Sequence, residues 1–261
     1  MLISFLITHY NRPQSLATCI NSIHHHVAKI NYEIIISDDC SKKENIEKIK
    51  QLNYDKLILS KQNTGLASNI NRGIDKCQGQ YIVYIQEDFG INQEFANQID
   101  HILKILDKDK IEMIRLRSNV NFKTYHLIQG YFKLIPRFAP QNFLIDHYRY
   151  SDHPYVVKTN FFKKFGYYKE NVNTSYGENE YMIRMMKLNP KIAICKNECV
   201  DSYNFEGSIR EENHLDKPHP LFKLKNLKPI KRILNSLRFK IEYLFYRPQK
   251  RSLYTFENLR K

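Results

Sequence analysis

The sequence predicts an α/β fold in which helices cover both faces of a mainly parallel sheet. Short apolar runs alternate with amphipathic helical patterns through about the first hundred of its 261 residues, as in repeated βαβ units. The run Tyr81–Ile85 is a second indication, because an apolar stretch this short fits a strand that is buried on both faces. It ends in Gln86, Glu87 and Asp88, at the strand end where open α/β sheets bind ligands.

Each expected element has its own local pattern. In one helix Phe95, Ile99 and Ile102 share a face, which is the spacing of an amphipathic helix. The opening stretch MLISFLITHYN is interpreted as a first core strand rather than a signal peptide, because no basic segment precedes its apolar run. The expected strands are 2–8, 33–37, 56–60, 81–86 and 111–116, and the expected helices are 13–27, 43–52, 65–77 and 92–107.

The pattern changes in the second half of the chain. Residues 118–155 are irregular and aromatic, and a helix over 178–188 and a strand over 191–195 follow them. From Pro229 to Tyr246, apolar residues recur at helical spacing with lysines and arginines away from that stripe, which predicts a basic amphipathic helix. Residues 222–261 carry +10 of the formal net charge of +14. The chain is therefore divided into 1–110, 111–221 and a basic helical tail, 222–261.

Three groups of polar residues follow three of the expected strands. Because the carboxyl ends of parallel strands lie at one edge of a sheet, the groups are expected to converge. Carboxylates accept hydrogen bonds from a base or a ribose, and a carboxylate can also hold a divalent cation against a diphosphate. Taken singly, each group is equally compatible with a helix cap or a turn. The groups are Thr8, Tyr10, Asn11 and Arg12; Asp38 and Asp39; and Glu87 and Asp88.

Several stretches, in order along about residues 1–208, resemble the family 2 glycosyltransferases, which have the GT-A fold. The stretch FLITHYNRPQSLATCINSI resembles their opening strand, loop and helix, and EIIISDDCS resembles their second strand with its paired acids. The approach to their DxD-type motif is similar to NTGLASNINRGIDKCQGQYIVYIQED. Their acceptor half is similar to VVKTNFFKKFGYYKEN and YGENEYMIRMMKLNPKIAI. Linked motifs in order are more specific than any single one.

The resemblance implies a nucleotide-sugar donor and sugar transfer with inversion. It makes residues 1–110 the donor half and residues 111–221 the acceptor and catalytic half. It also places Asp39 at the base, Glu87 near the ribose and diphosphate, and Asp88 at the metal-binding acid, which would hold Mn²⁺ or Mg²⁺. Asn63 and Gly65 are expected to shape a loop under the diphosphate. The nucleotide-sugar-binding residues expected in all are Thr8, Tyr10, Asn11, Arg12, Asp39, Asn63, Gly65, Glu87 and Asp88.

The same resemblance indicates the catalytic base. When the sequences are aligned on Arg184, the family's catalytic acid, more often Asp, falls on Glu178, and the following acid falls on Glu180. We expect Glu178 to be the base, with Glu180 as the alternative. Simpler interpretations exist for both, since Glu180 and Arg184 are spaced for an ion pair and Glu178 would complement the positive end of a helix from its first turn.

Two positions depart from the family pattern for a metal. Gln86 replaces the first acid of the DxD-type motif, and Phe205 stands where many members have a histidine. Mg²⁺ can bind through one carboxylate together with phosphates and waters, so Asp88 remains the expected ligand. His214 or Arg210 would compensate as a ligand or as a fixed positive charge.

The tail indicates where the protein works. Its basic helix would let residues 229–251 lie on anionic lipid, where each nearby Lys or Arg contributes ~1 kcal/mol. The alternative is a helix that covers the domain and has a solvated basic face. No stretch approaches the ~18 apolar residues that span a bilayer. We expect a cytoplasmic protein, peripheral on the inner face of the cytoplasmic membrane, with a lipid-linked or cell-envelope glycan as acceptor.

Two rival functions are compatible with parts of the sequence. A sugar nucleotidylyltransferase would share a related sheet, but THYNR does not resemble its glycine-rich GxGTR loop. A basic nucleic-acid-binding or lipid-binding protein on a catalytically inactive GT-A scaffold is suggested by Gln86 and the charge of +14. That rival predicts salt-sensitive binding to polyanions, whereas the transferase is expected to bind no nucleic acid.

Overall fold

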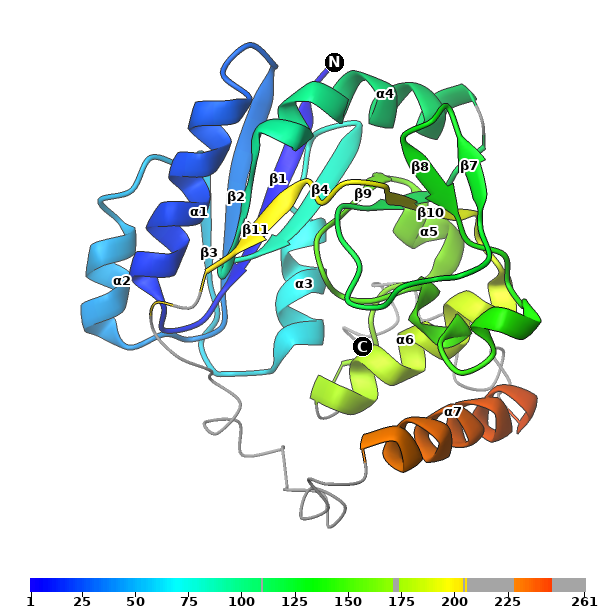
Figure 1. The fold of residues 1–261 in the computed structure, drawn as a ribbon. Helices are drawn as coiled ribbons and strands as arrows, with labels where there is room; N and C mark the ends of the chain where they lie inside the picture. The colour runs from blue at the N-terminus through cyan, green and yellow to red at the C-terminus, as the bar shows by residue number, and fades with distance from the viewer. Residues whose placement is uncertain (109, 171–173, 204, 206–227, 246–261) are drawn as a thin grey trace.

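A central sheet with helices on both faces forms the body of the protein (Figure 1). The computed structural model describes residues 1–108, 110–170, 174–203, 205 and 228–245. Within that part, only β8 and β9 run against the other strands of the nine-stranded sheet, which is therefore mainly parallel, as predicted. In sheet order the strands are β3 (Lys56–Leu59), β2 (Tyr32–Asp38), β1 (Ile3–His9), β4 (Tyr81–Gln86), β9 (Tyr155–Lys158), β6 (Met113–Arg115), β10 (Ile192–Cys195), β8 (Phe132–Leu134) and β7 (His126–Ile128).

The helices form two layers because strand side chains alternate between the faces of the sheet. Phe5 and Ile7 of β1 pack into one apolar cluster, while Leu6 between them packs into the other. The first cluster includes side chains of α1 (Pro13–His26), α2 (Lys43–Ile49) and α4 (Gln93–Lys108). The second includes side chains of α3 (Leu66–Ile74), α5 (Phe161–Phe165) and α6 (Thr174–Leu188).

The expected elements of the first 116 residues are all present, with ends that differ by up to three residues. The largest difference in the second half concerns α6, which begins at Thr174 rather than at Glu178. The polar residues that open this helix carry no apolar periodicity, so the sequence pattern did not reveal them. Glu178 consequently lies in the second turn of α6. Its position is therefore not explained as a first-turn acid that complements the positive end of the helix.

A second, two-stranded sheet was not predicted. In it β5 (Phe89–Ile91) pairs antiparallel with β11 (Val200–Ser202). Because β5 begins directly after Asp88, Glu87 and Asp88 form a two-residue turn between β4 and β5. The short 3₁₀ helices η1 (Pro140–Asn142) and η2 (Asp146–Arg149) lie in the aromatic stretch that was expected to be irregular.

The tail helix, α7 (Lys228–Phe245), lies beside α6 (Figure 1). Its docking face uses Phe239, which stacks on the His147 ring with centroids 4.3 Å apart, and Lys240, which forms an ion pair with Asp146. The predicted apolar stripe points elsewhere, because its side chains are 43 to 79 % exposed. This α7 stripe consists of Ile230, Ile233, Leu234, Leu237, Ile241, Leu244 and Phe245.

Candidate active site

The carboxyl ends of β1, β2 and β4 meet at one edge of the sheet. Thr8 lies opposite Ser37 on one side and opposite Gln86 on the other, in parallel register. The three predicted polar groups therefore converge. The Thr8 hydroxyl is buried and lies 3.3 Å from the hydroxyl of Tyr84, so it forms part of the buried base of the site.

The first two acids have different surroundings, and Asp38 belongs to the scaffold. Its Oδ2 lies 2.7 Å from Nδ1 of the buried His9, and the Ser41 amide donates to its Oδ1 at 2.8 Å. The Arg12 amide donates to His9 Nε2 at 3.0 Å, so Nδ1 is the nitrogen that carries the proton toward Asp38. Burial favours a higher pKa for Asp38, but hydrogen bonds from His9 and Ser41 outweigh it and lower the pKa.

Asn11 joins the first loop to the start of α2. Its φ of 55° lies in the left-handed region that asparagine tolerates better than most residues. The Asn11 amide donates to Ser41 Oγ at 2.7 Å, and its side-chain oxygen accepts from the Lys42 amide at 2.8 Å. The side chain that was expected to bind nucleotide therefore already holds the loop, while the neighbouring Tyr10 is partly exposed.

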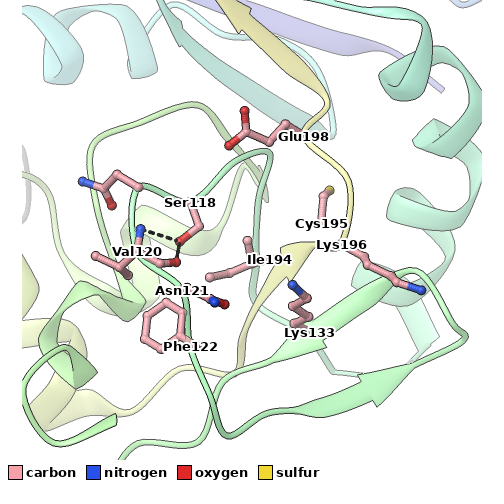
Figure 2. Close-up of a pocket in the computed structure, with 10 residues that line it drawn as sticks. Ser118, Val120, Asn121, Phe122, Lys133, Ile194, Cys195, Lys196 and Glu198 are labelled. Atoms are coloured by element: carbon pink, nitrogen blue, oxygen red, sulfur yellow. Dashed lines mark hydrogen bonds between the residues drawn. The ribbon is translucent and has the colours of Figure 1, made fainter.

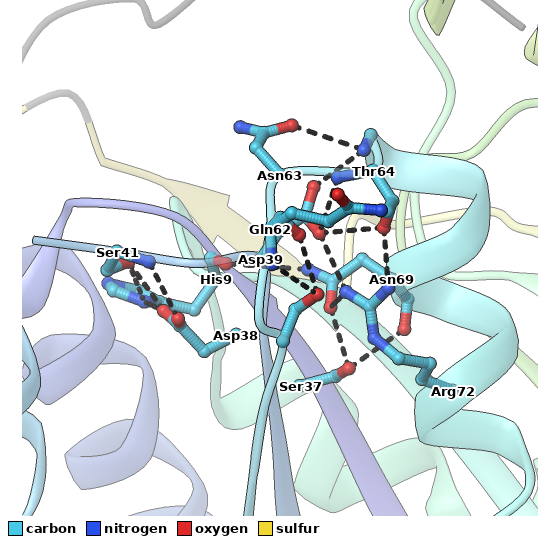
Figure 3. Close-up of polar contacts among 12 residues, drawn as sticks. His9, Ser37, Asp38, Asp39, Ser41, Gln62, Asn63, Thr64, Asn69 and Arg72 are labelled. Atoms are coloured by element: carbon cyan, nitrogen blue, oxygen red, sulfur yellow. Dashed lines mark hydrogen bonds and ion pairs between the residues drawn. The ribbon is translucent and has the colours of Figure 1, made fainter. Parts of the chain in front are cut away.

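Asp39 points the other way and organises the loop before α3 (Figure 3). Its buried carboxylate accepts hydrogen bonds from the Thr64 amide and hydroxyl, both at 3.1 Å, and from the Gly65 amide and Arg72 Nη2, both at 2.7 Å. Asn63 Oδ1 also lies 3.2 Å from the Gly65 amide. Gly65 has a φ of 84°, where a residue without Cβ is favoured.

Arg12 reaches across the edge to the acids after β4. Its Nη1 lies 3.5 Å from Asp88 Oδ2 and 3.7 Å from Glu87 Oε1. Burial raises the pKa of Glu87 to about 7, with Asp88 adding to the rise and His9 and Arg12 opposing it. Burial also raises the pKa of Asp88, and Arg12 again opposes it. The guanidinium of Arg12 thus faces the carboxyl groups of Glu87 and Asp88. A charged ligand that binds here would change the charge of these two carboxyls.

The residues present suit a cation held mainly by Asp88. Its Oδ1 is buried and makes no hydrogen bond to any described residue, so a cation would satisfy it. Within the described ranges, no three His, Cys, Asp or Glu side chains gather into a metal site. Phe205 is 53 % exposed and stacks on Tyr203, and the suggested compensators His214 and Arg210 lie outside the described residues. One carboxylate with phosphate and water oxygens is a donor set that Mg²⁺ accepts.

The two candidate bases on α6 differ in accessibility. Glu180 is buried and accepts a hydrogen bond from Arg184 Nε at 3.1 Å, while Arg184 Nη1 donates to the Tyr167 carbonyl at 2.5 Å. Glu180 is therefore part of a buried ion pair. Glu178 is partly exposed, and its charge adds to the rise that burial causes in the pKa of Asp152.

Asp152 is the site residue that sequence reasoning missed. It lies in an irregular stretch, three residues before β9, where no local pattern indicated it. In the structure β9 runs antiparallel to β4 with Tyr155 opposite Tyr84, and this register leads Asp152 toward the turn at Glu87. Its charge adds to the rise that burial causes in the pKa of Asp88, and the charge of Glu178 adds to the rise that burial causes in the pKa of Asp152 itself. Asp152 therefore connects the predicted donor acids with the predicted base.

A cavity of about 380 Å³ opens beyond the carboxyl ends of β6 and β10 (Figure 2). These strands point the same way as β4, so the cavity lies along the same sheet edge as the acids. The Leu116 amide donates to the Pro154 carbonyl at 2.9 Å, which sets the loop that lines the cavity beside the loop that carries Asp152. Its lining includes Ser118, Asn119, Asn121, Phe122, Lys133 and Glu198.

Comparison with known sequences identifies relatives of this chain. A family profile described as "Glycosyl transferase family 2" matches residues 4–172. An "Uncharacterized glycosyltransferase" of Haemophilus influenzae is 27% identical over an alignment of 151 residues, gaps included, that covers 49% of this chain and 58% of that protein. The "Putative glycosyltransferase EpsH" of Bacillus subtilis is 27% identical over an alignment of 100 residues that covers 37% of this chain and 29% of that protein. The chain spans less than two thirds of the length of these curated relatives.

Comparison with solved structures identifies a common fold. The crystal structure of S. aureus TarS 1–349 in complex with UDP-GlcNAc superposes with a TM-score of 0.62, covering 93% of this chain and 81% of that chain at 16% identity. The complex of the same protein with UDP gives a TM-score of 0.60 at 15% identity, covering 95% of this chain and 73% of that chain. This likeness confirms the predicted GT-A architecture.

Proposed function

The chain belongs to glycosyl transferase family 2, and from this premise we propose that it moves one sugar, with inversion, from a nucleotide-sugar donor to a lipid-linked or cell-envelope glycan. The family match and the relatives already establish a glycosyltransferase with a GT-A fold. The observation that carries the finer proposal is the convergence of Arg12, Asp88, Asp152 and Glu178 at one sheet edge.

The donor occupies the half formed by residues 1–110. Arg12 supplies positive charge beside the carboxyls of Glu87 and Asp88, which suits a diphosphate that arrives with a cation. The complexes of TarS with UDP and UDP-GlcNAc make uridine nucleotides the first candidates for the donor. Thr8, Tyr10, Asn11, Asn63 and Gly65 frame this donor site. Contact of Asp39 with a base requires Thr64 or Arg72 to release one of its four hydrogen bonds.

Asp88 would hold a Mn²⁺ or Mg²⁺ that arrives with the donor, since its Oδ1 makes no hydrogen bond to any described residue. A bound divalent cation supplies Lewis-acid stabilisation of the charge that develops on the leaving diphosphate. Asp88 Oδ2 lies beside Arg12 Nη1, so the same side chain would link a bound cation to the first loop. Gln86 then acts as a neutral neighbour rather than as a ligand.

Glu178 acts as the general base. Its carboxylate takes the proton from the acceptor hydroxyl while that oxygen forms a bond to the anomeric carbon. The bond from the anomeric carbon to the diphosphate oxygen breaks in the same step, so the nucleoside diphosphate leaves and the configuration inverts. Partial exposure lets Glu178 meet an entering hydroxyl, whereas the buried Glu180 is engaged by Arg184.

The acceptor lies in the half formed by residues 111–221. The cavity beyond β6 and β10 offers hydroxyl and amide side chains to sugar hydroxyls, together with the ammonium of Lys133. Its rim on the Ser118 side adjoins the loop of Asp152, so a glycan seated there would extend toward Glu178.

The tail of residues 222–261 places the enzyme on the inner face of the cytoplasmic membrane. The α7 stripe remains exposed although the helix is docked, and Phe138 and Phe143, which contact Lys240 of α7, are both 49 % exposed. Lys and Arg in this tail give it a net charge of +10, which attracts anionic lipid. Among the described helices none combines the length and apolarity of a bilayer span. Residues 246–251 of the expected contact lie outside the described part.

Ligand-dependent thermal stability tests the donor half of this proposal. UDP, GDP, dTDP and CMP are each added to the protein with and without Mn²⁺, and the preferred nucleotide is then supplied as its sugar conjugate to measure hydrolysis. We expect one uridine nucleotide to raise the melting temperature, more so with Mn²⁺, and its sugar conjugate to be hydrolysed slowly. If the protein binds polyanions in a salt-sensitive way and no nucleotide changes its melting temperature, the result would instead support a binding protein on an inactive GT-A scaffold. Transfer of the nucleotidyl group with release or uptake of pyrophosphate would support a nucleotidylyltransferase.

A further inference from the structure

A group of cationic and aromatic side chains lies where α7 meets the body of the protein, beside the end of α6 (Figure 1). The centroid of the Tyr243 ring on α7 lies 5.3 Å from Cζ of Arg137 and 4.3 Å from Nζ of Lys187, in the last turn of α6. Arg137 Nη2 also donates a hydrogen bond to the Tyr243 hydroxyl, and its Cζ lies 5.1 Å from the ring centroid of Phe138. Arg137, Lys187 and Tyr243 form what we call the Tyr243 cluster.

The two cations of the Tyr243 cluster have no anionic partner in the part of the chain that the structure describes. Neither Arg137 nor Lys187 forms an ion pair there, and Arg137 Nε is buried without a hydrogen bond to any described residue. Asp146, a buried acid at this junction, already pairs with Lys240. Both cations are partly buried, and a charge that loses water without gaining a partner is unfavourable. An anion bound between them would offset that cost.

A third cation adds to the positive charge of this junction. Arg149 is buried and donates to the side-chain oxygen of Asn189 at 3.0 Å and to the Pro190 carbonyl at 2.9 Å, which are both neutral acceptors. Burial and then the charge of Arg137 lower the pKa of Arg149 to about 10, with Asp146 opposing them. Positive charge therefore exceeds negative charge among the described residues around the Tyr243 cluster, which favours an anionic ligand.

Exposed apolar surface adjoins the Tyr243 cluster. Residues three and four apart on a helix are neighbours, so Lys240 lies next to Tyr243 and also next to Leu244 of the α7 stripe. The Lys240 ammonium lies 5.6 Å from the ring centroid of Phe138 and 4.9 Å from that of Phe143, and both rings are 49 % exposed. Apolar surface thus continues from the α7 stripe to the edge of the cationic cluster. A ligand that matches both has a negatively charged head and apolar chains.

We propose that the Tyr243 cluster binds the phosphate group of an anionic lipid, whose chains lie along Phe138 and the α7 stripe. The guanidinium N–H groups of Arg137 match phosphate oxygens, and Lys187 adds a second positive charge. The aromatic rings hold both cations in place, so little side-chain freedom is lost when the phosphate binds. This inference rests on the lipid contact proposed for the tail. It adds a defined headgroup site to the diffuse attraction of the tail's net charge.

The observations favour a lipid over other compounds that carry phosphate. A free phosphate ion would leave the α7 stripe uncovered, with its side chains 43 to 79 % exposed. A nucleic acid is held by cations that follow its backbone over several nucleotides, whereas the Tyr243 cluster offers two cations at one place. The stripe and the cluster together fit one amphiphilic ligand.

Calorimetric titration of the full chain with a short-chain lipid tests the proposal. Dihexanoyl phosphatidic acid is the probe, used as a monomer in solution. Arg137→Gln and Lys187→Gln should each weaken its binding roughly 10-fold or more, because a charge-assisted contact with the phosphate is lost. Arg238→Gln is the matched control, since it removes the same charge from α7 at a side chain that is 52 % exposed and pairs with Glu242. It should change the affinity by less than about 2-fold.

Two partial ligands separate the head from the chains. Inorganic phosphate has the charge without the chains, and dihexanoylglycerol has the chains without the phosphate. Each should bind roughly 10-fold or more weakly than the complete lipid, because it uses only one of the two surfaces. Equal affinity for inorganic phosphate would indicate a free-anion site, and equal affinity for dihexanoylglycerol would show that the cations take no part. Tighter binding of a single-stranded oligonucleotide at Arg137 and Lys187 would indicate nucleic acid. Any of these results would overturn the proposal.

The Lys187→Gln variant keeps the test decisive if Arg137→Gln disturbs the docking of α7. Lys187 belongs to α6, so its substitution leaves the hydrogen bond between Arg137 and Tyr243 in place. Wild-type affinity for the lipid in Lys187→Gln would show that the phosphate is bound elsewhere. If the lipid binds as expected and no sugar is transferred, the proposed function fails and the lipid site stands. If sugar is transferred and neither variant changes lipid binding, only the lipid site is wrong.

Discussion

Arg72 on α3 donates a hydrogen bond from Nη2 to Oδ1 of Asp39 at the end of β2, over 2.7 Å. The same guanidinium reaches the Thr64 hydroxyl at 2.6 Å, so one side chain holds both the acid and the loop that the acid organises. The proposed base-binding end of the donor site therefore depends on α3, the helix that follows this loop, because α3 carries Arg72.

Substitution of Arg72 tests this arrangement. Arg72→Ala removes a charge-assisted bond to the buried Asp39, so the free energy of unfolding should fall by about 1–3 kcal/mol and nucleotide affinity should fall with it. Denaturant unfolding and nucleotide titration measure the two effects. Lys76→Ala is the control, because its ion pair with Asp75 is half exposed and should contribute under ~1 kcal/mol. Equal effects in the two variants would refute a special role for Arg72.

The cation assignment is tested at the turn after β4. Asp88→Asn should abolish the extra thermal stabilisation that Mn²⁺ gives to the nucleotide complex, because the unpaired carboxylate oxygen is lost. Gln86→Asp is the reciprocal variant, since it restores a second acid near Asp88 and should strengthen the dependence on Mn²⁺. Persistence of the full Mn²⁺ effect in Asp88→Asn would show that the cation is held elsewhere.

The two acids on α6 should respond differently to the same chemical change. Glu178→Gln should lower transfer by roughly 10²- to 10⁴-fold and leave nucleotide affinity unchanged, as expected for loss of a general base. Glu180→Gln should instead destabilise the protein by up to ~3–5 kcal/mol, because it leaves Arg184 buried without its anion. Kinetics and denaturant unfolding separate the two roles, and normal transfer by Glu178→Gln would exclude it as the base.

Membrane contact is tested on the α7 stripe. Ile241 is 57 % exposed, and Ile241→Asp should weaken binding to anionic vesicles roughly 10-fold or more, since burial of an Ile in lipid contributes ~1.5–3 kcal/mol. Asn235→Asp adds the same charge to the same helix away from the stripe and controls for repulsion alone. Vesicle sedimentation measures both variants, and nucleotide affinity should stay constant. If both variants lose the same amount of vesicle affinity, the apolar stripe does not enter the lipid and the helix is held by electrostatic attraction alone.

Acid pH should weaken the scaffold around Asp38. Since the folded-state pKa of Asp38 is lowered, its contribution is present at neutral pH and is lost as the pH falls through that lowered value. Asp38→Asn should therefore be less stable than the wild type at pH 7, by about 1–3 kcal/mol. The difference should begin to narrow below about pH 4, where the carboxyl of the unfolded chain protonates, and should be lost once the folded protein also takes up the proton at a lower pH. A difference in unfolding free energy that does not change with pH would contradict this assignment.

Much of the donor half could be predicted from the sequence because its signals are local. Apolar runs such as Tyr81–Ile85 and stripes such as Phe95, Ile99 and Ile102 specify their elements over a few neighbouring residues. Parallel strands then place every residue that follows a strand at the same edge, so Thr8, Asp39 and Asp88 converge without further information.

The sequence by itself thus determined the family, the alternating elements and the edge at which the acids meet. Only the tertiary structure decided how neighbouring residues divide their work. Asp38 and Asp39 are adjacent, yet one binds His9 and the other binds the Gly65 loop. Asp152 lies toward the turn at Glu87, and α7 turns its apolar stripe outward, because partners from distant segments set these positions. Periodicity within a segment carries no information about which distant segment will lie against it.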